Sequence, residues 1–442
     1  MQKIDLLIEN GFVLDFEDNS EIPKPKNIAI QNGKILEIGL PNDLKIKYDP
    51  EILLPADSKI VMPGFVNAHT HLSMSYFKGL ADDLPLMEWL SKHIWPVEDK
   101  FLSEEFVTDA ALHGCAEMIK NGITIFNDMY FFGDQAAQSA EKVGIRAMLG
   151  EGVLDAPVAN YQNADEILSY IEQMNDKYKD HELIDFAIAP HAIYTCGKEN
   201  LVKSTKLASK LGLLVHIHLS ETRSEVEDCL KQNRKRPVEY LNSIDFFENP
   251  VVIAHGIWLN EDEQNILADK KASIAINTSS NLKLASGFDS FKSYLDYGIN
   301  LSIGTDGVAS NNNLSILEEI SLTTKLQKAL NNDPTILPAK EMIRIATLGG
   351  AKALNKENEI GSLKVGKKAD IILIDTEDIQ VQPIYNLYSH LVYTINSEQI
   401  KDVIINGNIV MKDRQLVNVD EEELIEKAKY YKKKIAEFNS NK

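Results

Sequence analysis

Two histidines stand one residue apart in the stretch PGFVNAHTHLSMSYFKGL, which opens at Pro63. His69 and His71 come at the end of an apolar run. In an extended strand, residues i and i+2 point to the same face, so both imidazoles enter one space. Two buried imidazoles without partners would be unfavourable, whereas a divalent metal ion satisfies both. The spacing therefore predicts a metal site at the end of this strand.

Side chains that bind metals end two further apolar runs. HIHLSE carries His218, and SIGTDG carries Asp306. Three imidazoles and one carboxylate leave a coordination position for water, which is typical of a catalytic site rather than a closed structural one. We predict that His69, His71, His218 and Asp306 bind one divalent metal ion. We expect zinc, with iron as the alternative, because both metals accept these ligands.

Other polar residues near the strand ends are not expected to bind the metal directly, with His216 as the alternative to His218. His216 shares a strand face with His218, so either could bind metal. We favour His218 because Glu221 follows it by three residues, and we place His216 deeper in the interior. Asp128 is interpreted as a structural acid or as a partner of a ligand. The remaining histidines lie in helical or loop contexts and are interpreted as surface or packing residues: His93, His113, His181 and His390.

Eight apolar runs alternate with helical patterns over residues 62–355. The runs are IVMPGFVNAHTH, ITIFNDMY, RAMLGEGVLD, DFAIAPHAIYTC, LLVHIHLSE, VVIAHGIWL, SIAINTSS and NLSIGTDG. One helix between them has Ser103 as its N-cap and stops at Gly122. Eight such units predict an α/β fold, a (β/α)8 TIM barrel, with a doubly wound sheet as the alternative. Barrel chemistry occurs at the carboxyl ends of the strands, where the predicted metal ligands stand.

The two ends of the chain share a different pattern. Asn-Gly pairs between apolar runs at 10–11, 32–33 and 406–407 predict hairpins. We therefore predict a small β-sandwich built from residues 1–61 and 359–442, flanking a catalytic barrel over 62–358. The segment DEEELIEKAKYYKKKIAEF, with acids first and lysines late, predicts a surface helix near the C-terminus.

Composition excludes several classes of partner. The 442 residues carry a net charge of −20, which argues against nucleic acid and anionic membranes. The three cysteines are far apart, which excludes a disulfide framework and a thiolate zinc site. The N-terminal stretch lacks the apolar core of a signal peptide, and no apolar run is as long as a membrane span. We expect a cytoplasmic protein; a homo-oligomer is compatible with these features.

Seven stretches together resemble the amidohydrolase superfamily, in its cytosine deaminase and chlorohydrolase branch. Within that branch the chain is most similar to the 5-methylthioadenosine/S-adenosylhomocysteine deaminases. The stretches are MPGFVNAHTHLSMSYFKGLADDLPLMEWLSKHIWPVED, NDMYFFGD, APHAIYTC, HIHLSET, IAHGIWL, NTSSNLKLASG and SIGTDGVASNNNL. The resemblance implies a metal-dependent hydrolytic deaminase of 5'-methylthioadenosine, adenosine or a related nucleoside, which forms an inosine-type product and ammonia.

The resemblance also implies roles for individual residues. It implies that the metal ligands are the four residues named above and that Glu221 shuttles protons. It also implies that His255 holds and polarises the attacking hydroxide, and we expect Asp306 to help take up or orient its proton. The substrate contacts that the resemblance implies come from Trp89, Glu98 (at the ribose hydroxyls), His191, His218 and Glu221. No lysine ends the DFAIAPHAIYTC run, where related binuclear enzymes bridge two metals, so one metal is expected.

One departure from the family concerns the substituent at the 5' position. Glu151 stands where members that accept S-adenosylhomocysteine carry an arginine, and APVANYQNADE lacks a second expected arginine. An arginine would bind the carboxylate of the amino acid group, whereas Glu151 would repel it. A neutral group such as methylthio is therefore favoured, and aminodeoxyfutalosine remains a further candidate.

Two other classes of function are compatible with the scaffold. Guanine or cytosine deaminases and chloro-triazine hydrolases share this scaffold and differ only in the loops that form the pocket. An assembly protein of the superfamily that has lost its metal is disfavoured, because all four ligands and Glu221 are present.

Overall fold

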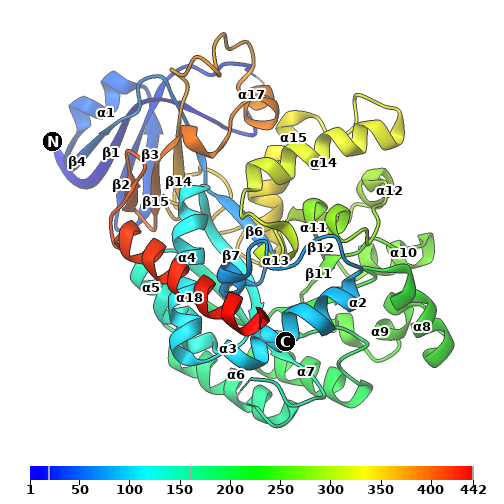
Figure 1. Cartoon of the computed structure of the whole chain (residues 1–442). Coiled ribbons are helices and arrows are strands. Elements are labelled where there is room, and N and C mark those ends of the chain that lie inside the picture. Colours follow the sequence, from blue (N-terminus) through cyan, green and yellow to red (C-terminus); the bar gives the residue numbers. More distant parts are fainter. Residues whose placement is uncertain (18–19, 160, 441–442) are drawn as a thin grey trace.

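Eight parallel strands form a barrel in the computed structural model, which describes residues 1–17, 20–159 and 161–440 (Figure 1). The strands are β6 (Phe65–Thr70), β7 (Ile123–Tyr130), β8 (Arg146–Val153), β9 (Ile184–Pro190), β10 (Val215–Leu219), β11 (Val251–His255), β12 (Ser273–Ile276) and β13 (Asn300–Ile303). Each lies beside the next in chain order. The last returns to the first, where the Asp306 amide donates to the His69 carbonyl at 3.0 Å. The predicted barrel is therefore confirmed.

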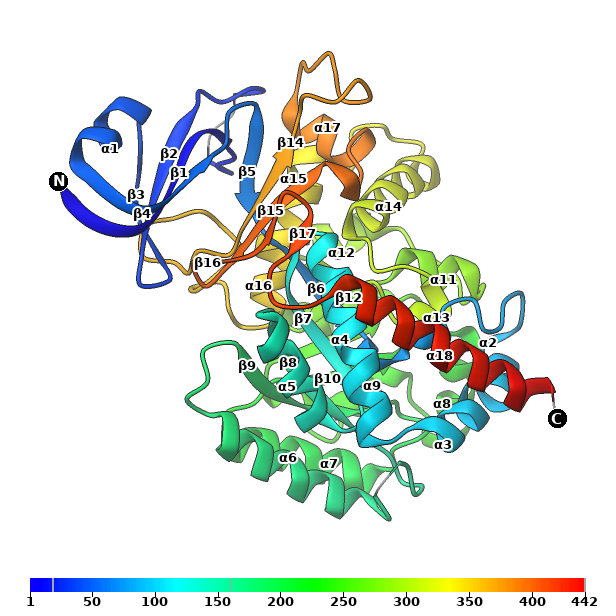
Figure 2. The same cartoon turned by 60° about the vertical axis from the view of Figure 1, so that its left-hand side comes forward.

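Helices lie around the barrel, most of them on its outside and a few over its two ends (Figures 1 and 2). They are α4 (Glu104–Lys120), α5 (Gly133–Val143), α6 (Ala164–Tyr178), α7 (Lys198–Leu211), α8 (Arg223–Asn233), α9 (Pro237–Asn242), α10 (Glu261–Asp269), α11 (Thr278–Lys283), α12 (Phe291–Asp296), α13 (Val308–Asn311), α14 (Ile316–Asn331), α15 (Ala339–Arg344) and α16 (Gly350–Ala353). As predicted, α4 is capped by Ser103, whose hydroxyl accepts from the Phe106 amide. Such a cap satisfies one of the free amides of the first turn.

The connection between β6 and α4 is long and carries four short helices. They are η1 (Leu72–Phe77), α2 (Leu86–Trp89), η2 (Leu90–Ile94) and α3 (Trp95–Phe101). This connection begins directly after His71, so its path determines what covers the end of β6. Residues of this connection also form part of the wall of a cavity at the carboxyl end of the barrel.

Both ends of the chain meet in one further sheet of nine strands. The strands are β1 (Gln2–Val13), β2 (Lys26–Gln31), β3 (Lys34–Gly39), β4 (Tyr48–Pro55), β5 (Lys59–Pro63), β14 (Ile371–Asp375), β15 (Ile400–Ile405), β16 (Asn408–Lys412) and β17 (Gln415–Leu416). Its N-terminal and C-terminal parts join where β5 pairs with β14. Side chains from both parts, among them Leu6, Ile30, Leu373 and Ile404, form one apolar cluster. Burial of that cluster is what holds the two chain ends together.

Two of the three predicted hairpins are present. Asn32-Gly33 joins β2 to β3, and Asn406-Gly407 joins β15 to β16. The hairpin predicted at Asn10-Gly11 is wrong, because β1 continues through both residues to Val13. Asn10 has a φ of 63°, and the register with β2 shifts between Ile8 and Gly11. The left-handed residue therefore makes a bulge, which turns the strand without reversing it.

The single strand predicted for IVMPGFVNAHTH is two strands. Residues 59–63 form β5 in the terminal sheet, and β6 begins the barrel at Phe65. Gly64 separates them, and a Cβ there would lie 2.2 Å from side-chain atoms of Thr124. Only glycine allows the backbone this close approach. One apolar run thus serves two sheets.

The C-terminal helix, α18 (Glu421–Ser440), lies across the barrel helices α3 and α4 in both views (Figures 1 and 2). Its Tyr431 ring stacks on Tyr76 with centroids 5.0 Å apart, and Lys427 pairs with Asp109 at 2.5 Å. Residues 441–442 of the predicted C-terminal segment lie outside the described residues. The remaining short helices are α1 (Pro41–Lys47), α17 (Leu387–Tyr393), η3 (Phe246–Glu248), η4 (Ile345–Gly349) and η5 (Ser397–Gln399). No described helix is both long and apolar enough to span a membrane.

Candidate active site

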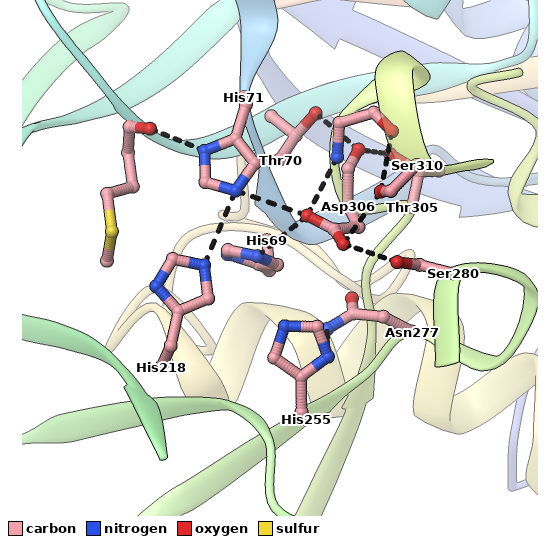
Figure 3. Close-up of polar contacts among 12 residues, drawn as sticks. His69, Thr70, His71, His218, His255, Asn277, Ser280, Thr305, Asp306 and Ser310 are labelled. Atoms are coloured by element: carbon pink, nitrogen blue, oxygen red, sulfur yellow. Dashed lines mark hydrogen bonds and ion pairs between the residues drawn. The ribbon is translucent and has the colours of Figure 1, made fainter. Parts of the chain in front are cut away.

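The four predicted metal ligands converge at the carboxyl end of the barrel. One donor atom from each of His69, His71, His218 and Asp306 lies within 4.8 Å of all the others. The Nε2 atoms of His69 and His71 each lie 3.2 Å from Oδ1 of Asp306. Nε2 of His218 is 3.3 Å from Nε2 of His71. Figure 3 shows His69 and His71 directed toward the Asp306 carboxylate and His218 directed toward His71.

The second ring nitrogen of each imidazole ligand is held by a neighbour. Nδ1 of His71 lies 2.6 Å from the Met129 carbonyl, and Nδ1 of His218 lies 2.8 Å from the His191 carbonyl. Because a carbonyl can only accept, both Nδ1 atoms carry a proton and leave Nε2 free to bind a cation. Nδ1 of His69 contacts Nε2 of the fully buried His216 at 2.9 Å. His216 therefore lies below the ligands, as predicted.

Asp306 is held through both its backbone and its side chain. Its carbonyl accepts from the hydroxyls of Thr70 and Thr305, and its φ is 58°. Its Oδ2 atom accepts from Ser280 at 2.6 Å and from Ser310 at 2.9 Å (Figure 3). A left-handed aspartate is uncommon, and the surrounding hydrogen bonds stabilise it. They leave Oδ1 directed at the imidazoles.

The chemistry of this donor set fits a divalent cation. Burial lowers the pKa of His69 to about 4 and that of His218 well below its usual range, so both rings are neutral donors. The Nε2 atom of His69 is buried and makes no hydrogen bond to any described residue. The histidine contacts outweigh burial and hold the pKa of Asp306 well below its usual range. Once metal binding has displaced the proton from His71 as well, one anion lies among neutral imidazoles, which is the environment that zinc and similar ions occupy.

Glu221 and His255 lie beside the metal ligands. Oε2 of Glu221 is 3.8 Å from Nε2 of His255, and Oε1 accepts from the Ser286 hydroxyl at 2.9 Å. Nδ1 of His255 donates to Oδ1 of Asn281 at 2.7 Å, which leaves its Nε2 unprotonated in the neutral ring. The φ of His255 is 72°, so the backbone turns sharply at the end of β11. A carboxylate and an imidazole acceptor thus face the same space.

Glu225 holds the turn that carries Glu221. Its carboxylate accepts from the amides of Ser220 and Glu221 at 2.8 and 2.9 Å. Asp128 has a comparable role after β6, since its Oδ1 accepts from the Leu72 amide at 2.7 Å. Asp128 therefore anchors the residue that follows His71, in agreement with its interpretation as a structural acid.

A cavity of about 630 Å³ opens over these groups. All predicted substrate contacts line it: Trp89, Glu98, His191, His218 and Glu221. Glu98 is buried and accepts from the Tyr130 hydroxyl at 2.6 Å. Trp89 is held by its indole N–H, which donates to the Ala81 carbonyl at 3.1 Å. Nδ1 of His191 lies 2.8 Å from the Thr195 hydroxyl.

Glu151 does not face this cavity, so its predicted repulsion of a substrate carboxylate is wrong. Its side chain is buried and accepts from the amides of Phe132 and Gly133 at 2.8 and 2.9 Å. The Tyr161 hydroxyl donates to it at 3.0 Å. These contacts place Glu151 at the start of α5, where a helix N-terminus favours negative charge.

Sequence reasoning missed the residues that hold the reacting groups in place. They are Tyr130, Asn281, Ser280, Ser286, Ser310 and Glu225. Most follow the strands in polar stretches such as NTSSNLKLASG and TDGVAS. The position after a barrel strand was the available signal, but nothing in the sequence shows which partner each residue meets.

A family model described as the amidohydrolase family matches residues 60–410. The chain belongs to the amidohydrolase family. The matched range includes the whole barrel, all of β5 except Lys59, and most of the C-terminal part of the terminal sheet. The resemblance inferred from the motifs is therefore confirmed, and the strand ends that carry the ligands lie within the matched residues.

Relatives of this amidohydrolase match almost its whole length. It is 44% identical to a 5-methylthioadenosine/S-adenosylhomocysteine deaminase from Thermodesulfovibrio yellowstonii, over 97% of this chain and 98% of the relative. It is 41% identical to a 5'-deoxyadenosine deaminase from Methanocaldococcus jannaschii, over 96% and 98%. The crystal structure of an adenosine deaminase from Xanthomonas campestris with bound zinc matches with a TM-score of 0.96 and 37% identity, over 98% of this chain and 99% of that chain.

Proposed function

We propose that this amidohydrolase is a metal-dependent hydrolytic deaminase of an adenosine derivative such as 5'-methylthioadenosine, 5'-deoxyadenosine or adenosine. The observation that carries the proposal is the meeting of the four-residue metal group with Glu221 and His255 in one cavity. The names of the three similar proteins support the choice of nucleoside.

The metal would be held by His69, His71, His218 and Asp306. When bound, a divalent ion lowers the pKa of a water molecule toward about 7, which makes a nucleophile available at neutral pH. Nε2 of His255 is the free acceptor that orients this nucleophile, since Nδ1 is committed to Asn281. Attack is directed at C6 of the adenine ring, the carbon that bears the amine.

Glu221 supplies the proton transfers that the reaction needs. Its Oε1 atom is held by Ser286, so Oε2 is left to face the ring. As the oxygen of the attacking water adds to C6, the Glu221 carboxylate takes one proton from that water and delivers it to a ring nitrogen, which prevents negative charge from accumulating in the ring. It then takes the second proton of the same water and passes it to the departing amine. Ammonia leaves, and an inosine-type product remains.

Glu98 is suited to the ribose. The Tyr130 hydroxyl occupies only one of its oxygen atoms, so the other can accept from sugar hydroxyls. Trp89 and His191 line the same cavity, and their aromatic rings can contact a bound nucleoside. This arrangement favours a nucleoside over a free base, which has no hydroxyls to satisfy a buried carboxylate.

A substrate panel tests the proposal. Zinc-loaded protein is incubated with 5'-methylthioadenosine, 5'-deoxyadenosine and adenosine, and in parallel with guanine, cytosine and a chlorinated triazine. We expect ammonia release and an inosine-type spectrum with the adenosine derivatives. Turnover of guanine, cytosine or the triazine without turnover of any adenosine derivative would contradict the proposal.

A further inference from the structure

We propose that the cavity selects adenosine derivatives whose 5' substituent carries no negative charge, and discriminates against those that end in a carboxylate or a phosphate. This inference rests on the proposed function and narrows its substrate class. It starts from the charges that line the cavity. No lysine or arginine is found among the described residues of the lining, whereas five carboxylates are: Glu98, Asp99, Asp155, Glu221 and Asp306.

Two of these carboxylates lie where the cavity opens to solvent. Asp99 and Asp155 are both exposed. Asp155 accepts from the Gly197 amide and from Nδ2 of Asn200, each at 2.8 Å. Both donors are neutral, so they orient the carboxylate without cancelling its charge. An anionic substituent would therefore meet negative charge as it enters and after it binds.

The histidines of the lining do not reverse this balance. His71, His218 and His255 belong to the metal site and its neighbourhood. Nδ1 of His191 lies 2.8 Å from the Thr195 hydroxyl, and its ring packs against that of His218 with centroids 4.8 Å apart. The rest of the wall offers apolar side chains, including Leu86, Leu102, Phe131, Leu154 and Val158. A thioether, a methyl group or a simple hydroxyl is compatible with such a wall, but an unpaired anion is not.

Cations are present only in a neighbouring cavity of about 940 Å³, among the described residues of the two linings. That cavity contains Arg223 and Lys283. The guanidinium of Arg223 lies 5.2 Å over the Trp258 ring, and Lys283 pairs with Asp82. The two cavities share only four lining residues, Leu86, Tyr194, Glu221 and Leu284. Because Glu221 lines both cavities, a carboxylate is present at the boundary between them.

The sharpest test is a pair of substrates that differ in charge but hardly in shape. Adenosine-5'-carboxamide and adenosine-5'-carboxylate are compared with the same zinc-loaded protein, both as substrates and as competitive inhibitors of 5'-methylthioadenosine deamination. We expect kcat/KM, or the affinity of binding, to favour the carboxamide by at least about tenfold. Added salt should reduce this ratio by screening the repulsion, which a purely steric effect would not show.

Arg223→Gln provides the matched control, because it removes one of the two cations that line the neighbouring cavity. The ratio of carboxamide to carboxylate should be the same in this variant. A ratio near one in the unaltered protein, or a ratio that rises in Arg223→Gln, would overturn the inference while the proposed function stands. Failure to deaminate 5'-methylthioadenosine itself would instead count against the proposed function.

Discussion

The two ends of the barrel treat buried charge in opposite ways. At the amino end, Arg146 of β8 meets Asp370 through two contacts, at 2.6 and 3.3 Å, and also donates to the Glu182 carbonyl and to Asn406. The Arg146 and Asp370 side chains are only 7% and 2% exposed, so each charge is matched within the chain. At the carboxyl end, Asp306 faces imidazoles that remain neutral or take up a proton from solvent. The first arrangement is complete in itself, whereas the second has a place for a cation.

The state of His71 illustrates this difference. Burial lowers its pKa, but the hydrogen bond and charge of Asp306 outweigh burial and raise the pKa to about 9. A proton on His71 therefore balances Asp306 when no metal is present, and metal binding must displace it. No such exchange is possible at Arg146, because a guanidinium does not release its proton in proteins. The amino end of the barrel therefore contributes to stability, and the carboxyl end carries the chemistry.

Asp306→Asn should have the largest effect at the carboxyl end. The carboxamide keeps the size of the side chain but removes the only anionic ligand. We expect loss of bound metal and a fall in kcat/KM on the order of 10⁴ or more, because the nucleophile is no longer activated. Metal analysis and an ammonia-release assay measure both quantities. A variant that keeps one equivalent of zinc and near-normal turnover would remove the distinction between the two ends.

Glu221→Gln should separate metal binding from proton transfer. The carboxamide cannot shuttle a proton, so kcat should fall by about 10²–10⁴. Metal content should remain that of the unaltered protein, because Glu221 is not among the four grouped ligands. If the variant retained near-normal kcat, the assignment of the proton transfers to Glu221 would be wrong.

Arg146→Met tests the amino end. It leaves the buried Asp370 without its partner, so the free energy of unfolding should fall by about 3–5 kcal/mol. Metal content and kcat/KM should change by less than about twofold, because the two ends are separate sites. Lys356→Met at the more exposed pair with Asp185 is the control and should cost no more than about 1 kcal/mol. Loss of metal from Arg146→Met under native conditions would show that the ends are coupled.

Ser286→Ala should give the smallest effect. Its hydroxyl holds one oxygen of Glu221, so its removal loosens the carboxylate without discharging it. We expect kcat to fall by about tenfold, equivalent to one hydrogen bond to a charged group. Ser243→Ala, at a surface turn, should leave kcat unchanged. An effect as large as that of Glu221→Gln would mean that Ser286 takes part in the proton transfer itself.

The carboxyl end was far easier to predict from the sequence than the amino end. Strand periodicity brings His69 and His71 to one face, and parallel strands bring His218 and Asp306 to the same rim. Arg146 and Asp370 are separated by 224 residues; Arg146 begins barrel strand β8, and Asp370 directly precedes β14 of the terminal sheet, so no local pattern links them. Contacts of this kind depend on how the terminal sheet docks on the barrel.

The errors have local physical causes. At Asn10, a positive φ serves a bulge as well as a turn, so the dipeptide alone could not distinguish the two. At Gly64, one apolar run crosses from one sheet to another, and hydrophobicity continues through the boundary. Glu151 occupies a position where related enzymes carry a substrate-binding arginine, but its side chain points toward backbone amides at the start of α5. The sequence predicts that Glu151 lies in a barrel strand, but it does not show the direction in which the carboxylate points.

Titration of metal-free protein with zinc tests the central claim most directly. Ammonia release from 5'-methylthioadenosine is followed as zinc is added in fractions of an equivalent per chain. We expect no activity before zinc is added, then a linear rise to a plateau at one equivalent per chain. Asp306→Asn should show neither the rise nor the plateau. Full activity in the metal-free protein, or a plateau only at two equivalents, would contradict a single cation bound by three histidines and an aspartate.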